Sequence, residues 1–298
     1  MRRLSSALAL LVVAACAGQA AGEPVATTGA ATAAVATPVP VTSTTTTTGL
    51  TNTTTIPTTT TTPSPHARPD WLGARPLPLR PDGHGEVQPT PDELIDRRLE
   101  TVDLLEPPET TEFRSSIEPV PEEVLARSSW VEECPVTVDE LRYLTMTHHG
   151  FDGEAHTGEM VVNVAVADDV VEVFRRLYEA RFPIESMRVI RLEEVDDHPT
   201  GDWNETTSFV CRPAVGSSNW SYHAYGLAID VNPFHNPYVK GDLVIPELAS
   251  AYVDREYERV GMIQEGEVVT RAFADVGWEW GGNWDTLKDW MHFSTTGR

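Results

Sequence analysis

The sequence predicts an α+β domain over residues 130–298, in which helices flank an antiparallel sheet. The composition changes at Trp130, where aromatic residues, glycines and periodic apolar residues begin to appear together. Helical and strand-like patterns then follow one another without the regular alternation that a parallel βαβ sheet requires. This irregular order favours antiparallel pairing.

The individual elements follow from local patterns in the order of the chain. Thr137 or Asp139 can cap a helix that continues through Thr147. Apolar residues recur at helical spacing after Asp168, and a later helical pattern ends at Gly277. Short apolar runs rich in β-branched residues indicate strands. We therefore predict strands at 160–166, 187–192, 227–231 and 290–293, and further helices at 168–182 and 268–276.

Residues 23–129 are predicted to be a tether and a weakly ordered linker. As far as about Pro65 the chain consists of Thr, Pro, Ala and Val with almost no charged or aromatic residue, so no core can form there. This bias favours a stiff, extended tether. Residues 70–127 remain Pro-rich and acidic, with one short amphipathic stretch at 91–105.

Residues 1–22 have the pattern of a lipoprotein-type signal segment. Two arginines precede an apolar run at 8–15, which is too short to span a membrane in the mature protein. Val13-Ala14-Ala15 lead directly into Cys16, which predicts cleavage before Cys16 and lipidation of its sulfur. The protein would then be exported and held at the outer face of the cell membrane or in the cell wall. The alternative is an ordinary signal that is cleaved near Ala21 and yields a secreted protein.

The charge balance excludes one class of partner. The formal net charge is −23, and the sequence contains no cluster of Lys and Arg of the kind that phosphate binding needs. We therefore expect no nucleic-acid partner, and we interpret the acidity as a solvated surface. We expect a monomer.

Two cysteines remain when Cys16 is set aside. In an oxidising compartment Cys134 and Cys211 would have only each other as partners, which predicts one disulfide. The alternative is a pair of buried thiols.

Residues 221–233 contain the pattern with the most chemistry. His223 and Asp230 lie seven positions apart, and a turn at Gly226 leading into a strand would let them converge. A neutral imidazole and a carboxylate are both good zinc ligands. His292, in a comparable aromatic setting, is the candidate third ligand. Three protein ligands leave one tetrahedral position open, as in a catalytic site with a single zinc ion.

Two further residues could support hydrolysis at such a site. Asp289 lies three positions before His292 and could accept and return a proton. Arg212 could bind a substrate carboxylate or a developing oxyanion through its bidentate fork. Each residue alone also has an ordinary explanation, since single histidines are mostly structural and Asp230 could shape a turn.

Three motifs together resemble a known family. They are Ser-x-His-x-x-Gly-x-Ala-x-Asp at 221–230, Trp-Gly-Gly-x-Trp at 280–284 and Asp-x-x-His at 289–292. The combination resembles the D-alanyl-D-alanine carboxypeptidase family of zinc peptidases, which includes VanY- and VanX-type enzymes and endolysin L-alanyl-D-glutamate peptidases. Upstream similarity at 150–153, 156–159 and 182–184 extends the resemblance over nearly all of 130–298.

The resemblance implies roles for particular residues. It implies zinc ligands at His223, Asp230 and His292, an acid/base carboxylate at Asp289, where many members have Glu, and transition-state stabilisation by Arg212. It implies substrate contact by Ser221, although a turn-capping role stays open for this hydroxyl. Tyr225 and Trp280 are further candidate substrate-binding residues, with core packing left open for the tryptophan.

The implied activity is hydrolysis of peptidoglycan stem peptides, with removal of terminal D-alanine. Two alternatives stay open. The enzyme could be an endopeptidase that cleaves the L-Ala–D-Glu bond or a cross-bridge, because the motifs are shared by both activities. The chain could also be a non-catalytic lipoprotein that binds the cell wall.

Overall fold

The computed structural model describes residues 66–195, 200–214 and 217–297. The predicted signal segment, Cys16 and the Thr-rich tether up to residue 65 lie outside the described residues. The described part of the chain belongs to one compact unit.

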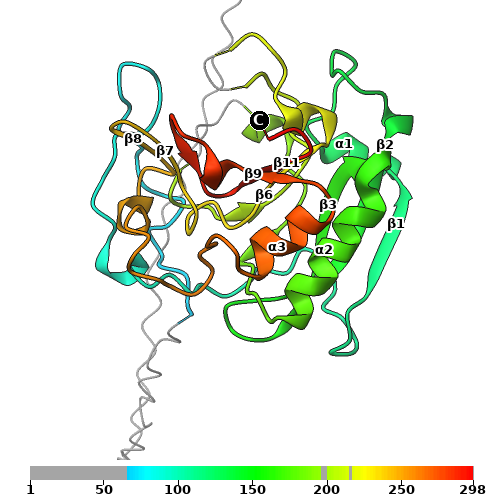
Figure 1. Cartoon of the computed structure of the whole chain (residues 1–298), viewed down its shortest axis with the longest axis horizontal. Helices are drawn as coiled ribbons and strands as arrows, with labels where there is room; N and C mark the ends of the chain where they lie inside the picture. Colours follow the sequence, from blue (N-terminus) through cyan, green and yellow to red (C-terminus); the bar gives the residue numbers. More distant parts are fainter. Residues whose placement is uncertain (1–65, 196–199, 215–216, 298) are drawn as a thin grey trace, which may run out of the picture. The chain divides into compact units, whose positions relative to one another are not determined.

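Short antiparallel sheets and a few helices make up this unit, which confirms the α+β prediction (Figure 1). The sheets have the strand orders β1-β2-β3, β10-β7-β8 and β6-β11-β9, and β4 and β5 form a small parallel pair. The helices are α1 (Glu122–Arg127), α2 (Ala167–Glu179) and α3 (Val268–Asp275). The strands are β1 (Ser115–Pro119), β2 (Leu141–His149), β3 (Ala155–Asn163), β4 (Ser186–Met187), β5 (Glu205–Thr206), β6 (Ala228–Asp230), β7 (Tyr238–Lys240), β8 (Leu243–Ile245), β9 (Glu279–Trp280), β10 (Lys288–Asp289) and β11 (His292–Ser294). Single 3-10 turns occur at Asp92–Leu94, Val138–Glu140, Val164–Val166, Leu192–Glu194, Tyr222–Tyr225, Ala249–Tyr252 and Gly281–Asn283.

The main core lies between the two longer helices and the sheets. Figure 1 shows α2 lying along β2 and β3, with α3 beside it. Phe174 and Leu177 of α2 are buried in the same cluster as Phe273 of α3 and Phe293 of β11. The rings of Phe273 and Phe293 stack with their centroids 4.0 Å apart. This core therefore joins the helical layer to the sheet that contains β6 and β11.

The helix predicted through Thr147 is wrong, because this segment forms strand β2. The capping pair Thr137 and Glu140 stabilises only the 3-10 turn Val138–Glu140. Strand β2 is then paired with β3 along its whole length and is buried on both faces. A strand that is buried on both faces loses the apolar–polar alternation that distinguishes it from a helix.

The other predicted elements are mostly present with shifted ends. Helices α2 and α3 confirm the helical patterns, and β6 and β11 lie within or beside the predicted strands. Strand β3 starts earlier than predicted and ends where the Asn163 side chain accepts a hydrogen bond from Ala165 N. The predicted strand at 187–192 shrinks to β4 and a 3-10 turn.

Residues 66–129 are not a weakly ordered linker, and the folded unit begins well before Trp130. Strand β1 pairs with β2, and α1 buries Val124 against the sheet. Upstream, Leu94 and Leu99 are buried in a second cluster with Phe234 and Tyr252. The prediction was wrong because a few apolar and charged side chains in this Pro-rich stretch find long-range partners.

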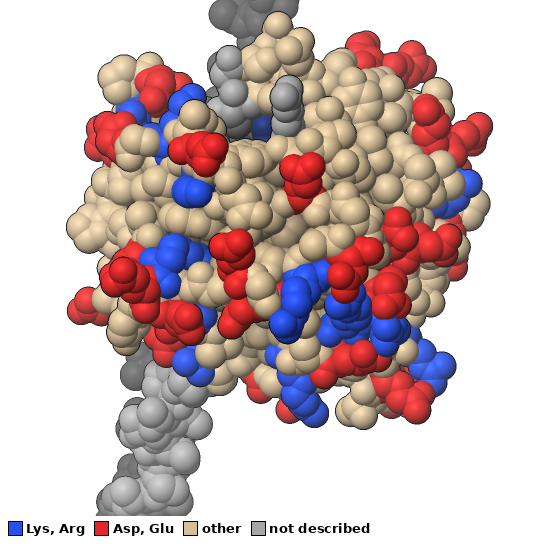
Figure 2. All heavy atoms as spheres, viewed as in Figure 1, with Lys and Arg blue, Asp and Glu red and all other residues tan. Residues whose placement is uncertain are grey.

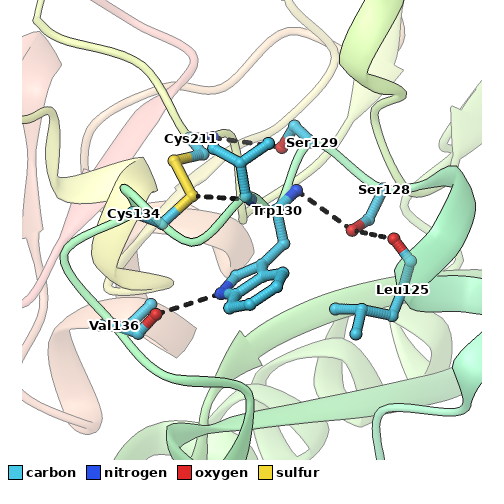
Figure 3. The surroundings of a disulfide bond; sticks show 8 residues. Leu125, Ser128, Ser129, Trp130, Cys134, Val136 and Cys211 are labelled. Atoms are coloured by element: carbon cyan, nitrogen blue, oxygen red, sulfur yellow. Dashed lines mark hydrogen bonds between the residues drawn. A yellow bond between two sulfur atoms is a disulfide. The ribbon is translucent and has the colours of Figure 1, made fainter.

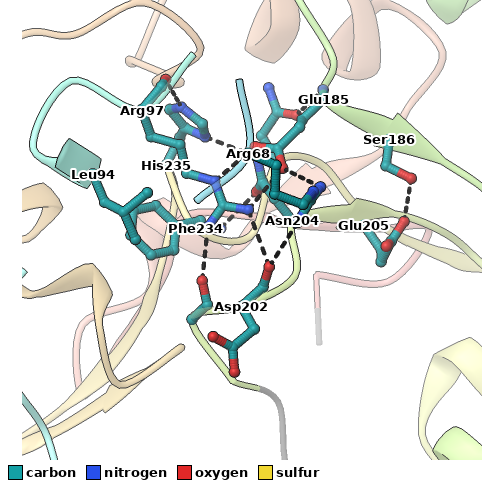
Figure 4. Close-up of polar contacts among 12 residues, drawn as sticks. Arg68, Leu94, Arg97, Glu185, Ser186, Asp202, Asn204, Glu205, Phe234 and His235 are labelled. Atoms are coloured by element: carbon teal, nitrogen blue, oxygen red, sulfur yellow. Dashed lines mark hydrogen bonds and ion pairs between the residues drawn. The ribbon is translucent and has the colours of Figure 1, made fainter. Parts of the chain in front are cut away.

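The strongest of these long-range contacts is a buried ion pair (Figure 4). The Arg97 side chain is fully buried, and its Nε and Nη2 each donate to a different carboxylate oxygen of Glu185 at 2.7 Å. Its Nη1 donates to the carbonyl of Gly201 at 2.7 Å, and the guanidinium lies over the ring of Phe234. Asn204 Nδ2 donates to Glu185 as well. The pair therefore anchors the upstream segment to the core.

Replacing Arg97 by Ala should lower the free energy of unfolding by about 3 to 5 kcal/mol, because Glu185 would lose its buried partner and keep only the part-exposed Arg68 at 3.3 Å. Chemical denaturation measures this. Arg98→Ala is the matched control, since Arg98 is exposed and its guanidinium pairs with Asp96 alone among the described residues, and it should cost less than about 1 kcal/mol. Equal losses for the two variants would contradict the anchoring role.

The surface shows the expected excess of acid. Asp and Glu side chains are spread over the face displayed in Figure 2, with many of the Lys and Arg side chains beside them. Among the described residues, no helix has the length and apolar character needed to cross a membrane.

Candidate metal centre

The three predicted ligands come from adjacent elements. His223 lies in the 3-10 turn Tyr222–Tyr225, Asp230 ends β6, and His292 begins β11. Strands β6 and β11 pair antiparallel with Asp230 directly opposite His292. Gly226 reverses the chain after His223 with a φ of 65°, and a Cβ at this position would lie 2.5 Å from Asn163 N. Only glycine fits there, so the predicted turn at Gly226 is confirmed.

The donor atoms of these side chains converge. His223 Nε2 lies 3.3 Å from Asp230 Oδ2 and 3.3 Å from His292 Nδ1, and His292 Nδ1 lies 3.1 Å from Asp230 Oδ1. A tetrahedral zinc ion with N and O ligands at about 2.0 to 2.2 Å separates those ligands by about 3.3 Å. Within the described residues this is the one group of three or more His, Cys, Asp or Glu that could hold a metal ion. The donor set and its spacing therefore fit zinc.

The backbone fixes the orientation of His223. Its Nδ1 lies 2.6 Å from the carbonyl oxygen of Ser208, to which it can donate, and this leaves the lone pair of Nε2 directed at the other donors. Ser208 follows Thr207, whose N–H and carbonyl both bond to the backbone of Asp230. Ser221 Oγ accepts from His223 N, so the contact that the structure gives Ser221 is that of a cap. These contacts fix the positions of His223 and Asp230 relative to each other.

The charge state of Asp230 suits a ligand. Burial opposes ionisation of this carboxyl, but the charges and hydrogen bonds of His223 and His292 hold its pKa well below the usual range. Asp230 is therefore a carboxylate at neutral pH and can accept a cation.

Asp289 lies beside the three donors with an unusual environment. Its Oδ1 is buried and has no hydrogen-bond partner among the described residues. Burial raises the pKa of Asp289 to about 7, the charges of His292 and Arg212 oppose this shift, and the Asp230 carboxylate adds to it. A carboxyl with this pKa can both accept and release a proton near neutral pH.

Arg212 is half-buried and faces the same site. Its charge acts on Asp289, while its Nη1 donates to the carbonyl of Pro213 at 3.2 Å. The carbonyl of Arg212 accepts from Ser221 N, which joins this segment to the turn that contains His223. The structure thus brings Arg212, Asp289 and the donor cluster together.

The predicted disulfide between Cys134 and Cys211 is present (Figure 3). It ties the residue before Arg212 to the segment that follows α1. Cys211 N also donates to Ser129 Oγ, and Trp130 Nε1 donates to the carbonyl of Val136. The disulfide therefore anchors the segment that contains Arg212 and Ser208.

Two predicted substrate-binding residues lie elsewhere. Trp280 is buried in the core, where its Nε1 donates to the carbonyl of Trp290 and its ring packs near Phe293. The structure thus gives Trp280 the core-packing role that the sequence left open. Tyr225 is half-buried and packs against the cluster around Phe209, and among the described contacts none joins it to the donor atoms. His235 is buried, with hydrogen-bonding contacts to Asn204 and to the Arg97 carbonyl, so it is no fourth ligand.

The structure adds residues that sequence reasoning missed. Ser208 orients His223 through its backbone, and no sequence pattern marks such a carbonyl. Gly281 lies directly against Asp289, since a Cβ there would be 2.6 Å from the Asp289 carbonyl oxygen and 2.9 Å from its Cβ. The Trp-Gly-Gly motif could have indicated this close approach. Tyr238 faces Asp289 across β7 and β10, which only the strand register reveals.

Comparison with known families gives a match over this part of the chain. The model of a family described as D-alanyl-D-alanine carboxypeptidase matches residues 215–295. That span includes His223, Asp230, Asp289 and His292, whereas Arg212 precedes it. No curated protein and no solved structure matches the chain. The matched residues contain the converging donor atoms, so residues 215–295 are similar to this D-alanyl-D-alanine carboxypeptidase family.

Proposed function

We propose that the protein is a zinc-dependent peptidase that removes terminal D-alanine from peptidoglycan stem peptides. The observation that carries this proposal is the convergence of His223, Asp230 and His292 donor atoms at 3.1 to 3.3 Å, beside a carboxyl whose Oδ1 is buried without a partner. The description of the matched family supports the peptidase class and this type of bond.

The side chains divide the chemistry between them. A zinc ion held by the three donors would polarise the scissile carbonyl and activate water for attack. Asp289 accepts the proton that the attacking water loses and donates it to the departing amino group. Its unpaired Oδ1 and raised pKa suit both transfers.

Arg212 supplies the positive charge on the substrate side. Its guanidinium can pair with the terminal carboxylate of the peptide or with the negative charge that develops on the carbonyl oxygen. Its half-buried position strengthens either interaction relative to water.

Mass spectrometry of muropeptides after incubation with the protein tests the proposal, with the zinc content measured on the same sample. Loss of one alanine from pentapeptide stems is the expected result. Release of stem fragments would identify an endopeptidase. Bound zinc without cleavage would point to another peptide substrate, and absence of both would favour a wall-binding protein without activity.

Gly281 should be essential for the position of Asp289. Gly281→Ala places a methyl group against the Asp289 backbone, and we expect kcat to fall about tenfold to hundredfold, because small displacements of a catalytic group are costly. The zinc content should not change. Gly266→Ala is the control, since it meets no atom within 4 Å but has a φ of 77°. It should lower the melting temperature without lowering kcat, and an unchanged kcat in Gly281→Ala would refute the role of Gly281.

We also propose that the protein is exported and lipid-anchored through Cys16 at the outer face of the cell membrane. The charged start, the apolar run and the Val-Ala-Ala-Cys sequence of residues 13–16 support this. The mass of the N-terminal peptide of the mature protein tests it, because a diacylglyceryl group on Cys16 would add to that mass. An N-terminus near residue 22 would instead indicate a secreted protein.

A further inference from the structure

We propose that the indole N–H of Trp284 binds the substrate beside the metal centre, by donating a hydrogen bond to a carbonyl or carboxylate oxygen of the peptide. This inference rests on the proposed peptidase function and concerns a residue of the Trp-Gly-Gly-x-Trp motif to which the mechanism above gives no role.

Trp284 lies at the end of the turn that positions Asp289. It follows the 3-10 turn Gly281–Asn283, and its backbone N–H donates to the carbonyl of Gly281 at 3.2 Å. Its ring is tilted against the imidazole of His292, with the centroids 5.5 Å apart. The side chain is half-buried and lies against one of the three donor side chains.

The indole nitrogen itself is buried and has no hydrogen-bond partner among the described residues. Three other tryptophans of the described chain have acceptors, since Trp71, Trp130 and Trp280 donate to Glu93, Val136 and Trp290. A buried donor without a partner costs stability, and buried indole N–H groups usually find an acceptor. A donor kept in this state beside a metal centre is explained when the substrate supplies the acceptor.

Two other unpartnered atoms belong to residues that interact with the ligands. They are Asp289 Oδ1 and Ser208 Oγ, both buried without a partner among the described residues. Ser208 is the residue whose carbonyl holds His223, and the Asp289 carboxyl interacts electrostatically with His292. Of the three atoms, Asp289 Oδ1 and Trp284 Nε1 belong to residues that interact with His292, so a bound peptide could supply partners on this side of the donor cluster.

The chemistry of the group restricts what it can bind. An indole N–H is a donor only, so its partner must be an acceptor oxygen. A peptide that ends in D-alanine offers two kinds, the backbone carbonyls and the terminal carboxylate. We therefore assign Trp284 as a substrate-binding residue that recognises one of these oxygens.

Trp284→Phe tests this, because it keeps a ring and removes the N–H. With diacetyl-L-lysyl-D-alanyl-D-alanine as substrate, kcat/KM should fall roughly tenfold to hundredfold, the range of a hydrogen bond to a polar or charged group. The zinc content should stay the same, and the melting temperature should stay the same or rise, since an unsatisfied buried donor is lost.

Trp280→Phe is the matched control. The same chemical change there removes the hydrogen bond to the Trp290 carbonyl, so the melting temperature should fall. If Trp284→Phe instead lowers the melting temperature as Trp280→Phe does and leaves kcat/KM unchanged, the N–H is structural and the inference is overturned.

A second measurement does not depend on turnover. The ¹H–¹⁵N resonance of the Trp284 indole, assigned by its absence in Trp284→Phe, should shift when the same peptide is added to zinc-loaded Asp289→Asn protein. A version of the peptide with ethylamine in place of the last D-alanine lacks the terminal carboxyl group and separates the two oxygens. A shift that persists indicates a backbone carbonyl, and a shift that is lost indicates the terminal carboxylate.

These results separate the two hypotheses. If the wild-type protein cleaves the peptide but neither kcat/KM nor the indole resonance responds as expected, only the role of Trp284 fails. If the wild-type protein does not cleave any stem peptide but the indole resonance shifts, the binding role stands and the proposed reaction fails.

Discussion

Replacing Asp289 by Asn should lower kcat by about a hundredfold to ten-thousandfold, the contribution typical of a positioned acid/base group, while the protein keeps its zinc. The amide has nearly the same shape as the carboxyl but cannot accept a proton. Because Oδ1 of Asp289 has no hydrogen-bond partner among the described residues, the substitution breaks no described contact of that atom. The loss should therefore appear in turnover and not in folding.

The measurement is kcat at saturating peptide, together with the zinc content and the melting temperature of the same preparation. Asp285→Asn is a suitable control, since Asp285 is exposed and precedes Asp289 by four residues in the same segment. This control should retain its activity. Turnover by Asp289→Asn that comes close to the wild-type rate would show that another group moves the proton.

His223→Ala should lose both the metal and the activity. It removes one of three donors, and the zinc affinity should fall by more than the tenfold to hundredfold that loss of an outer hydrogen-bond partner costs. It also leaves the carbonyl of Ser208 without the imidazole that it now contacts. Zinc analysis after gel filtration and a peptide cleavage assay measure the two effects.

Wild-type protein from which a chelator has removed the zinc serves as the comparison for His223→Ala. Wild-type protein should lose activity when a chelator removes its zinc and regain it when zinc is added, whereas His223→Ala should not recover at the same zinc concentration. Activity of the chelated wild-type protein would contradict the metal-dependent mechanism, and recovery of the variant would show that His223 is dispensable as a ligand.

The sequence predicted the donor cluster well because its first half is local. Gly226 permits the tight reversal that brings His223 towards Asp230 within seven residues. His292 joins them through strand pairing with Asp230, which only the combination of motifs could indicate. The orientation of His223 by the Ser208 carbonyl depends on tertiary structure, because every residue has a carbonyl and the sequence marks none of them.

The fold was harder to predict in two places. Strand β2 was taken for a helix because it is covered on both faces, so its apolar residues do not alternate. Residues 66–129 were taken for a linker because their composition is acidic and Pro-rich. Arg97 and Leu94 become buried only through partners far along the chain, Glu185 and Phe234 among them, and local patterns contain no information on such contacts.

Strand β1 has a further consequence for how the protein behaves at high concentration. It pairs with β2 from Ser115 to Pro119 and forms one edge of that sheet. It is short and mostly exposed, and it ends in Glu118 and Pro119, features that discourage a second chain from adding a strand. Without residues 66–129, strand β2 would lose its partner β1, and its backbone N–H and C=O groups on that side would be exposed at the edge of the sheet. The upstream segment thus protects the molecule from edge-to-edge aggregation.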